Sequence, residues 1–139
     1  MIRVAVIGLG YMGQNHLRVI SKFQEVKVVA ICDIDLAKTK RLAKLYKVRA
    51  YSDYKKLIRN EDLDAVFICL PTSLHFNAAR SAIDKSITVF IEKPICATPE
   101  QARKLIKAAS FKKVPVMVGH IERFNPVVSE IKQRIASGE

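Results

Sequence analysis

The 139-residue chain has no tryptophan, three cysteines, five glycines and five prolines. The cysteines show no C-x-x-C spacing and no histidine pair lies near them, so the sequence indicates neither a zinc site nor a disulfide framework. We therefore expect no metal, and we expect Cys32, Cys69 and Cys96 to be small buried or half-buried thiols. Glycine and proline are too scattered for a linker, a repeat or a low-complexity tract.

Long apolar runs are also absent. None approaches the roughly 18 residues of a membrane span, and the first residues already read as a strand that contains Arg3, which argues against a targeting segment. We expect a soluble, cytoplasmic protein with no membrane partner. Hydrophobic residues make up 50% of the chain, enough for a globular core, and the length is that of a single domain.

Acidic residues are scarce relative to basic ones. The 13 aspartates and glutamates against 24 lysines and arginines give a net charge of +11. Many basic residues lie on three helical segments, within residues 38–47, 55–59 and 103–113, without the interleaved aromatic residues that stack on bases. We interpret these basic residues as solvated helix faces and expect no nucleic-acid partner. The first alternative is that the positive charge attracts an acidic small substrate, and the second is that it binds nucleic acid.

A glycine-rich turn follows the apolar strand at residues 4–7. The pattern is G-x-G-x-x-G: Gly8 makes the tight turn, Gly10 lets the backbone approach a pyrophosphate, and Gly13 lets helix and strand pack closely. The N–H groups at the start of the next helix, together with its partial positive charge, would face the phosphates. Alone, the motif is also compatible with a simple loop. The cofactor-binding residues expected here are Gly8, Gly10, Tyr11, Met12 and Gly13.

Asp33 strengthens the interpretation of that turn. It ends the β-branched strand at residues 25–32 and lies 20 residues beyond Gly13, near the spacing at which an acidic side chain binds an adenosine ribose. A carboxylate ~4 Å from a 2′-phosphate meets repulsion of up to ~4 kcal/mol at an effective dielectric of about 20. The sequence therefore favours NAD over NADP, although Lys38, Lys40 and Arg41 lie close enough along the chain to keep NADP as the alternative.

Strand and helix patterns alternate along the whole chain. Apolar, β-branched runs predict strands at residues 4–7, 25–32, 48–51, 64–70, 87–91 and 114–119, and amphipathic patterns predict helices between them, the first at residues 14–21. This order predicts an α/β fold with a doubly wound parallel sheet, a Rossmann fold in three α/β/α layers. We expect a dinucleotide-binding domain at residues 1–119 and a final helix within residues 120–139.

Polar residues follow the fourth strand, where ligands of such sheets gather. Pro71 stops the strand, and we expect Leu70, Pro71, Thr72 and His75 to meet the cofactor. His75 is a candidate for orienting the nicotinamide half. The alternative is a capped or merely exposed histidine in the first turn of a helix.

The fifth strand runs directly into Glu92, Lys93 and Pro94. A lysine at this position would project into the same crevice as the other motifs, and the proline restricts its backbone to extended forms. We therefore expect Glu92 and Lys93 at the cofactor site, with Lys93 also as the catalytic residue. The alternative is a solvated lysine at a strand end.

Five motifs occur together and in order. They are Gly8 to Gly13, Asp33, Pro71-Thr72-Ser73-Leu74-His75, Glu92-Lys93-Pro94 and Gly119-His120-Ile121-Glu122-Arg123-Phe124-Asn125-Pro126. Over essentially its whole length the chain resembles the Gfo/Idh/MocA oxidoreductase family, although Thr72 stands where many members have asparagine. The resemblance implies a nicotinamide cofactor, with Lys93 near the reacting carbon of a sugar or cyclitol.

The resemblance also has implications for substrate and assembly. The stretch from Arg123 to Pro126, with Arg123 an expected cofactor contact, is similar to members acting on nucleotide-linked amino sugars, such as UDP-N-acetylglucosamine 3-dehydrogenases. Members continue into a C-terminal α/β domain that binds substrate and mediates homo-oligomerisation, and we expect this chain to be without that domain. We therefore expect the cofactor-binding portion of an NAD-dependent dehydrogenase, inactive alone. The alternative is a non-catalytic NAD-binding module.

Overall fold

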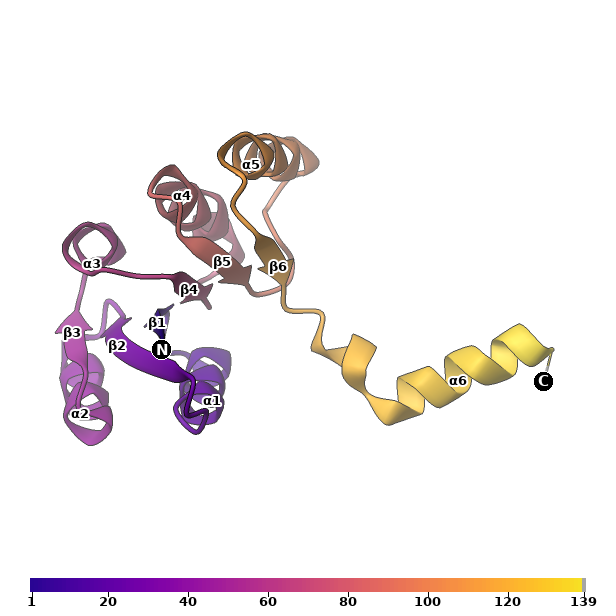
Figure 1. Cartoon of the computed structure of the whole chain (residues 1–139), viewed down its shortest axis with the longest axis horizontal. Helices are drawn as coiled ribbons and strands as arrows, with labels where there is room; N and C mark the ends of the chain where they lie inside the picture. The colour runs from indigo at the N-terminus through magenta and orange to yellow at the C-terminus, as the bar shows by residue number, and fades with distance from the viewer. Residues whose placement is uncertain (139) are drawn as a thin grey trace.

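A single parallel sheet forms the centre of the computed structural model, which describes residues 1–138. Its strands are β1 (Ile2–Ile7), β2 (Val26–Cys32), β3 (Arg49–Tyr51), β4 (Ala65–Ile68), β5 (Thr88–Ile91) and β6 (Val116–Val118). They lie in the order β3-β2-β1-β4-β5-β6, and every neighbouring pair is parallel (Figure 1). The predicted doubly wound Rossmann fold is confirmed.

Helices cover both faces of the sheet, as the predicted three layers require (Figure 1). They are α1 (Tyr11–Ile20), α2 (Leu36–Tyr46), α3 (Tyr54–Asn60), α4 (Thr72–Asp84) and α5 (Pro99–Lys112), followed by a 3₁₀ turn η1 (Ile121–Phe124) and α6 (Pro126–Ser137). One core packs α1 and α2 against β1 and β2. The other packs α3, α4 and α5 against the opposite face.

The switch in strand order places the functional segments. After β3 the chain crosses back to the middle of the sheet, so β4 pairs with β1 and Ile7 lies opposite Ile68. The turn after β1 and the loop after β4 are therefore neighbours, although about 60 residues separate them along the chain. Pro115 precedes β6, which is an edge strand as the proline predicts.

Side-chain caps fix where several helices begin. Asp35 accepts from the N–H of Lys38, Asp53 from that of Lys55, and Asn125 from that of Val127. Thr98 accepts from the N–H of Gln101, whose side chain reaches back to the N–H of Ala97. These caps satisfy N–H groups that have no partner inside the helix.

Two boundaries differ from the sequence prediction. The first helix begins at Tyr11 rather than residue 14, because Gly10 serves as its N-cap and the glycine motif runs into the first turn. The last strand is limited to Val116–Val118, and residues 121–124 form η1, which period-2 and period-3.6 patterns do not predict. Helix α6 then projects away from the sheet, and none of its described residues is buried (Figure 1).

Candidate functional site

The glycine turn joins β1 to α1 through two positions that tolerate no side chain. Gly8 has a φ of +93°, in the left-handed region that favours glycine, and an added Cβ would lie 2.5 Å from the carbonyl oxygen of Cys69. A Cβ on Gly13 would collide with the carbonyl oxygen of Gly8. The predicted roles of Gly8 in the turn and Gly13 in close packing are confirmed.

Gly10 has a different environment. A Cβ added there would meet no described protein atom within 4 Å, and Gly10 caps α1 without any side-chain hydrogen bond. The helical N–H groups that begin at Tyr11 and Met12 have no acceptor inside the helix. Open space and unused donors at a helix start fit a pyrophosphate group.

Asp33 is held against this turn by backbone N–H groups. Leu9 N–H donates to its Oδ2 at 2.6 Å, and Asp35 N–H donates to its Oδ1 at 2.9 Å. The Lys38 ammonium lies 3.2 Å from Oδ1. Burial acts to raise the pKa of the Asp33 carboxyl, but the two N–H groups and Lys38 together hold that pKa below its ordinary value. The group is therefore a charged acceptor at neutral pH.

A pocket of about 380 Å³ opens beside the turn, and we call it the glycine-turn pocket. It is lined by Gly8, Gly10, Asp33, Ile34, Lys38, Cys69, Leu70, Pro71 and Leu74. The structure thus brings together five of the predicted cofactor residues from three loops. Sequence reasoning did not select Ile34 or Leu74, whose exposed apolar side chains, 91% and 41% accessible, suit the flat face of a base.

His75 lies behind the loops rather than in the crevice. The residue is 1% exposed, with Nε2 of its ring at 2.7 Å from the Leu70 carbonyl oxygen and Nδ1 at 2.8 Å from the Pro94 carbonyl oxygen. Both partners are acceptors, so the neutral ring can donate to only one of them at a time. The expected contact with nicotinamide is replaced by a link between the loop after β4 and the loop after β5.

Glu92 and Lys93 point in different directions. Glu92 is 8% exposed, and its Oε1 lies 2.6 Å from Nε2 of His16, a residue of α1 that the sequence prediction missed. The two residues are 76 positions apart, and no pattern in the sequence links them. Lys93 is exposed, and the Lys93–Pro94 peptide bond is cis.

A second pocket, the Lys93 pocket, has a volume of about 570 Å³. It is lined by Lys93, Gly119, His120, Ile121, Glu122 and Arg123. The predicted catalytic lysine and Arg123 therefore share one pocket, built from the loop after β5 and the segment after β6. Arg123 does not line the glycine-turn pocket, so the structure groups it with Lys93 rather than with the glycine turn.

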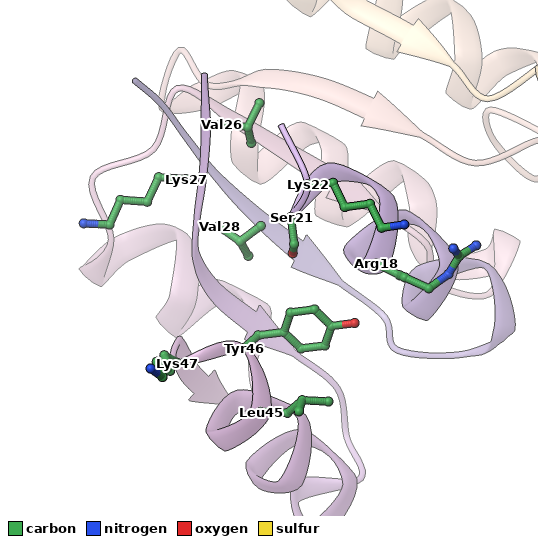
Figure 2. A pocket seen from close by; sticks show the side chains of 9 residues that line it. All are labelled: Arg18, Ser21, Lys22, Val26, Lys27, Val28, Leu45, Tyr46 and Lys47. Atoms are coloured by element: carbon green, nitrogen blue, oxygen red, sulfur yellow. The ribbon is translucent and has the colours of Figure 1, made fainter. Parts of the chain in front are cut away.

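A third pocket, of about 610 Å³, is basic (Figure 2). Arg18 and Lys22 lie on one side of it and Lys27 and Lys47 on the other, around a floor that includes Tyr46. It is built from the last turns of α1 and α2 and the start of β2, the opposite end of the strands from the glycine turn. In doubly wound sheets ligands bind at the carboxyl ends of the strands, so we do not assign this pocket to the cofactor.

The cysteines behave as predicted from their spacing. Cys32 and Cys96 are buried and Cys69 is half-buried, and all three are free thiols. Burial, and then the charge of Glu92, raises the pKa of the Cys69 thiol to about 12. Within residues 1–138, no group of three or more histidine, cysteine or acidic side chains has the arrangement of a metal site. No helix in that range is long and apolar enough to cross a membrane.

Three known proteins illustrate the similarity. The uncharacterized oxidoreductase YrbE of Bacillus subtilis is 32% identical in an alignment 139 residues long that covers 99% of this chain and 41% of YrbE. A scyllo-inositol dehydrogenase from Lactobacillus casei, solved with NAD(H) and scyllo-inositol, superposes with a TM-score of 0.91 at 27% identity, covering 99% of this chain and 42% of that one.

A biliverdin reductase from Synechocystis, solved with biliverdin and NADP⁺, has a TM-score of 0.90 at 27% identity and covers 97% of this chain and 43% of its own. The chain thus spans about two fifths of the length of the relatives it matches. Residues 2–120 match the Gfo/Idh/MocA family, described as an oxidoreductase family with an NAD-binding Rossmann fold. The chain therefore belongs to the Gfo/Idh/MocA oxidoreductases and comprises their NAD-binding Rossmann domain.

Proposed function

We propose that this chain is the cofactor-binding portion of an NAD-dependent dehydrogenase that moves a hydride between nicotinamide and a hydroxyl-bearing carbon of a sugar, cyclitol or nucleotide-linked sugar. One observation carries the proposal: the glycine-turn pocket and the Lys93 pocket open at the carboxyl ends of strands in one parallel sheet. An anion-binding turn and an exposed lysine at one sheet edge suit a cofactor bound next to its substrate.

Each group has a role that follows from its position. The N–H groups at the start of α1 bind the pyrophosphate, and Asp33, with lone pairs left beyond its three partners, accepts from the adenosine ribose. Leu70 and Pro71 form the wall that the nicotinamide half passes, with Thr72 next to them at the start of α4 and His75 fixing that wall from behind. The bound cofactor supplies the hydride acceptor or donor.

Lys93 acts on the substrate oxygen. Its ammonium donates a hydrogen bond to the hydroxyl or carbonyl at the reacting carbon, or relays the proton that leaves when the alcohol is oxidised. The polar groups of His120, Glu122 and Arg123 share its pocket and can orient further hydroxyls. A charged substrate, such as a nucleotide-linked sugar, suits Arg123 and the net charge of +11.

A second function concerns the chain by itself. We place its cofactor domain at residues 1–119 and infer that residues 120–139 lead toward a further domain in the proposed enzyme. Coverage of only 41% of YrbE and 42% of the scyllo-inositol dehydrogenase supports this division. Glu139 lies outside the described residues. The exposed Val127, Ile131 and Ile135 on α6 suit packing against that domain. Alone, the chain acts as a non-catalytic NAD-binding module.

Assembly and location are part of the same proposal. The complete protein is a homo-oligomer through the further domain, as the family resemblance implies, and it works in the cytoplasm, where its three free thiols stay reduced. No nucleic acid or membrane takes part.

Calorimetric titration of the chain with NAD and with NADP tests the binding proposal. We expect NAD to bind more tightly, and no heat with either cofactor would end the dinucleotide assignment. In the longer protein, Lys93→Met should abolish turnover while leaving NAD affinity within about twofold, since the lysine contacts the substrate. Unchanged turnover would remove Lys93 from the reaction.

A further inference from the structure

The Glu92 carboxylate has two described partners, one on each oxygen. His16 Nε2 lies 2.6 Å from Oε1, and the Lys93 N–H donates to Oε2 at 3.2 Å. The side chains of His16 and Glu92 are 15% and 11% exposed. A carboxylate this shielded from water needs such partners, since burying a charge without them is costly.

The surroundings of His16 make it the partner that sets the direction of Glu92. Its ring packs edge-on against Phe90 at 4.9 Å between centroids and lies 5.8 Å from Phe67. These rings fill the space on the α1 side of β4 and β5 and offer the carboxylate no hydrogen bond. On this side of the sheet, His16 is the polar side chain that Glu92 reaches.

Two backbone features allow Glu92 to turn this way. Side chains alternate along a strand, and Glu92, the first residue after β5, continues the side of Phe90 and so reaches His16 on α1. Gly119, which directly follows β6, leaves the room that the carboxylate needs, because a Cβ there would lie 3.1 Å from Oε1 and 3.0 Å from the Phe90 ring. Residues from α1, β5 and β6 therefore meet at one carboxylate.

We propose that His16 is a positioning residue for Lys93: it holds the Glu92 carboxylate on the α1 side, so that this carboxylate does not pair with the Lys93 ammonium in the Lys93 pocket. The inference rests on the proposed function, in which Lys93 meets the substrate oxygen. A carboxylate folded over the ammonium would occupy its hydrogen-bond donors and favour its charged form. No acidic side chain of residues 1–138 forms an ion pair with Lys93.

The amine itself gives the test, without a substrate or the further domain. The chain is labelled with limiting acetic anhydride, and the rate at Lys93 is measured by peptide mass spectrometry relative to the exposed Lys104 on α5. The His16→Leu variant should label about two- to fivefold more slowly at Lys93, the effect of one newly formed surface ion pair. In the Glu92→Gln background the same substitution should have no effect.

Two controls separate positioning from loosening of the loop. Arg18→Gln, on an exposed site of the same helix, should leave the Lys93 rate unchanged, and His16→Gln should keep it near the starting value because its amide can still donate. If His16→Leu does not fold, His16→Asn is used instead. Its amide is shorter than that of glutamine and should not reach Glu92, so the same slowing at Lys93 is expected. A purely structural role would expose the loop and speed labelling.

An unchanged or faster labelling rate at Lys93 in the His16→Leu variant would overturn the inference. Equal slowing by His16→Leu in the original chain and in the Glu92→Gln background would also overturn it. NAD titration of the same variants reports on the cofactor site separately. A chain that fails to bind NAD but shows the predicted labelling would therefore refute the proposed function and leave the positioning of Glu92 intact.

Discussion

Lys38 and Asp33 face each other across the rim of the glycine-turn pocket, with the Lys38 ammonium 3.2 Å from Oδ1 of Asp33. The carboxylate repels a 2′-phosphate, whereas the ammonium would attract one once the carboxylate is gone. The choice between NAD and NADP therefore depends on a balance between these two residues. The biliverdin reductase solved with NADP⁺ shares the fold, so the fold alone does not make this choice.

Replacing Asp33 by serine should shift that balance. We expect NAD affinity to fall about tenfold or more through loss of a charged acceptor for the ribose, and NADP affinity to rise because Lys38 becomes available to the phosphate. Titration of both cofactors gives the two constants. The Asp33→Ser, Lys38→Ala double variant is the matched control and should lose the gain in NADP affinity; a gain that survives would mean that Lys38 is not the phosphate partner.

Two substitutions in the glycine turn should affect different properties, one the stability of the chain and the other its affinity for NAD. Gly13→Ala should destabilise the chain by roughly 2 kcal/mol or more, because its Cβ would collide with the carbonyl oxygen of Gly8 and backbone must move. Gly10→Ala should change the free energy of unfolding by less than about 0.5 kcal/mol, since its Cβ meets open space. It should nevertheless weaken NAD binding at least about tenfold by filling the space of the pyrophosphate.

Urea denaturation and NAD titration of the two variants measure these effects. A Gly10→Ala chain that binds NAD normally would show that the pyrophosphate does not pass over this residue. A Gly13→Ala chain as stable as the original would mean that the helix can shift away from the turn at little cost.

How much of this site the sequence predicts depends on whether a pattern is local. Gly8, Gly13 and Asp33 were predictable because each lies at a fixed distance from a strand end, and the fold follows from the alternation of apolar periods. His16 was not, because its contact with Glu92 spans 76 residues and arises only when α1 packs beside β5. His75 was correctly predicted to lie near the loop after β4, but its predicted contact with the cofactor was wrong. The sequence alone does not show whether a residue in the first turn of a helix faces the crevice or the protein interior.

Cys69 provides a prediction about pH. Its thiol has a pKa raised to about 12, so the native chain keeps a proton that the unfolded chain releases near pH 9. The resulting stabilisation is complete below about pH 9 and is lost as pH rises toward 12. We expect the free energy of unfolding, measured by urea denaturation between pH 8 and 10.5, to fall less steeply with pH in Cys69→Ala than in the original chain. The two slopes should differ by up to about 1.4 kcal/mol per pH unit.

The same shift predicts that a disulfide reagent at pH 8 leaves Cys69 unmodified in the native chain, because the thiolate is the reactive form. Rapid reaction without denaturant, at a site identified by peptide mapping as Cys69, would contradict the burial that raises its pKa.

His75 links two loops, and its removal should affect both. His75→Phe keeps the bulk of the buried ring but leaves the carbonyl oxygens of Leu70 and Pro94 without this partner, at a cost of about 1–3 kcal/mol in the free energy of unfolding. The loop after β4 lines the glycine-turn pocket, so NAD affinity should fall as well, even though the residue itself is 1% exposed. His75→Gln, whose amide can still donate to one carbonyl, should lose less stability and less NAD affinity than His75→Phe. Equal stability but lower NAD affinity in the phenylalanine variant would instead point to a direct contact between the ring and the cofactor.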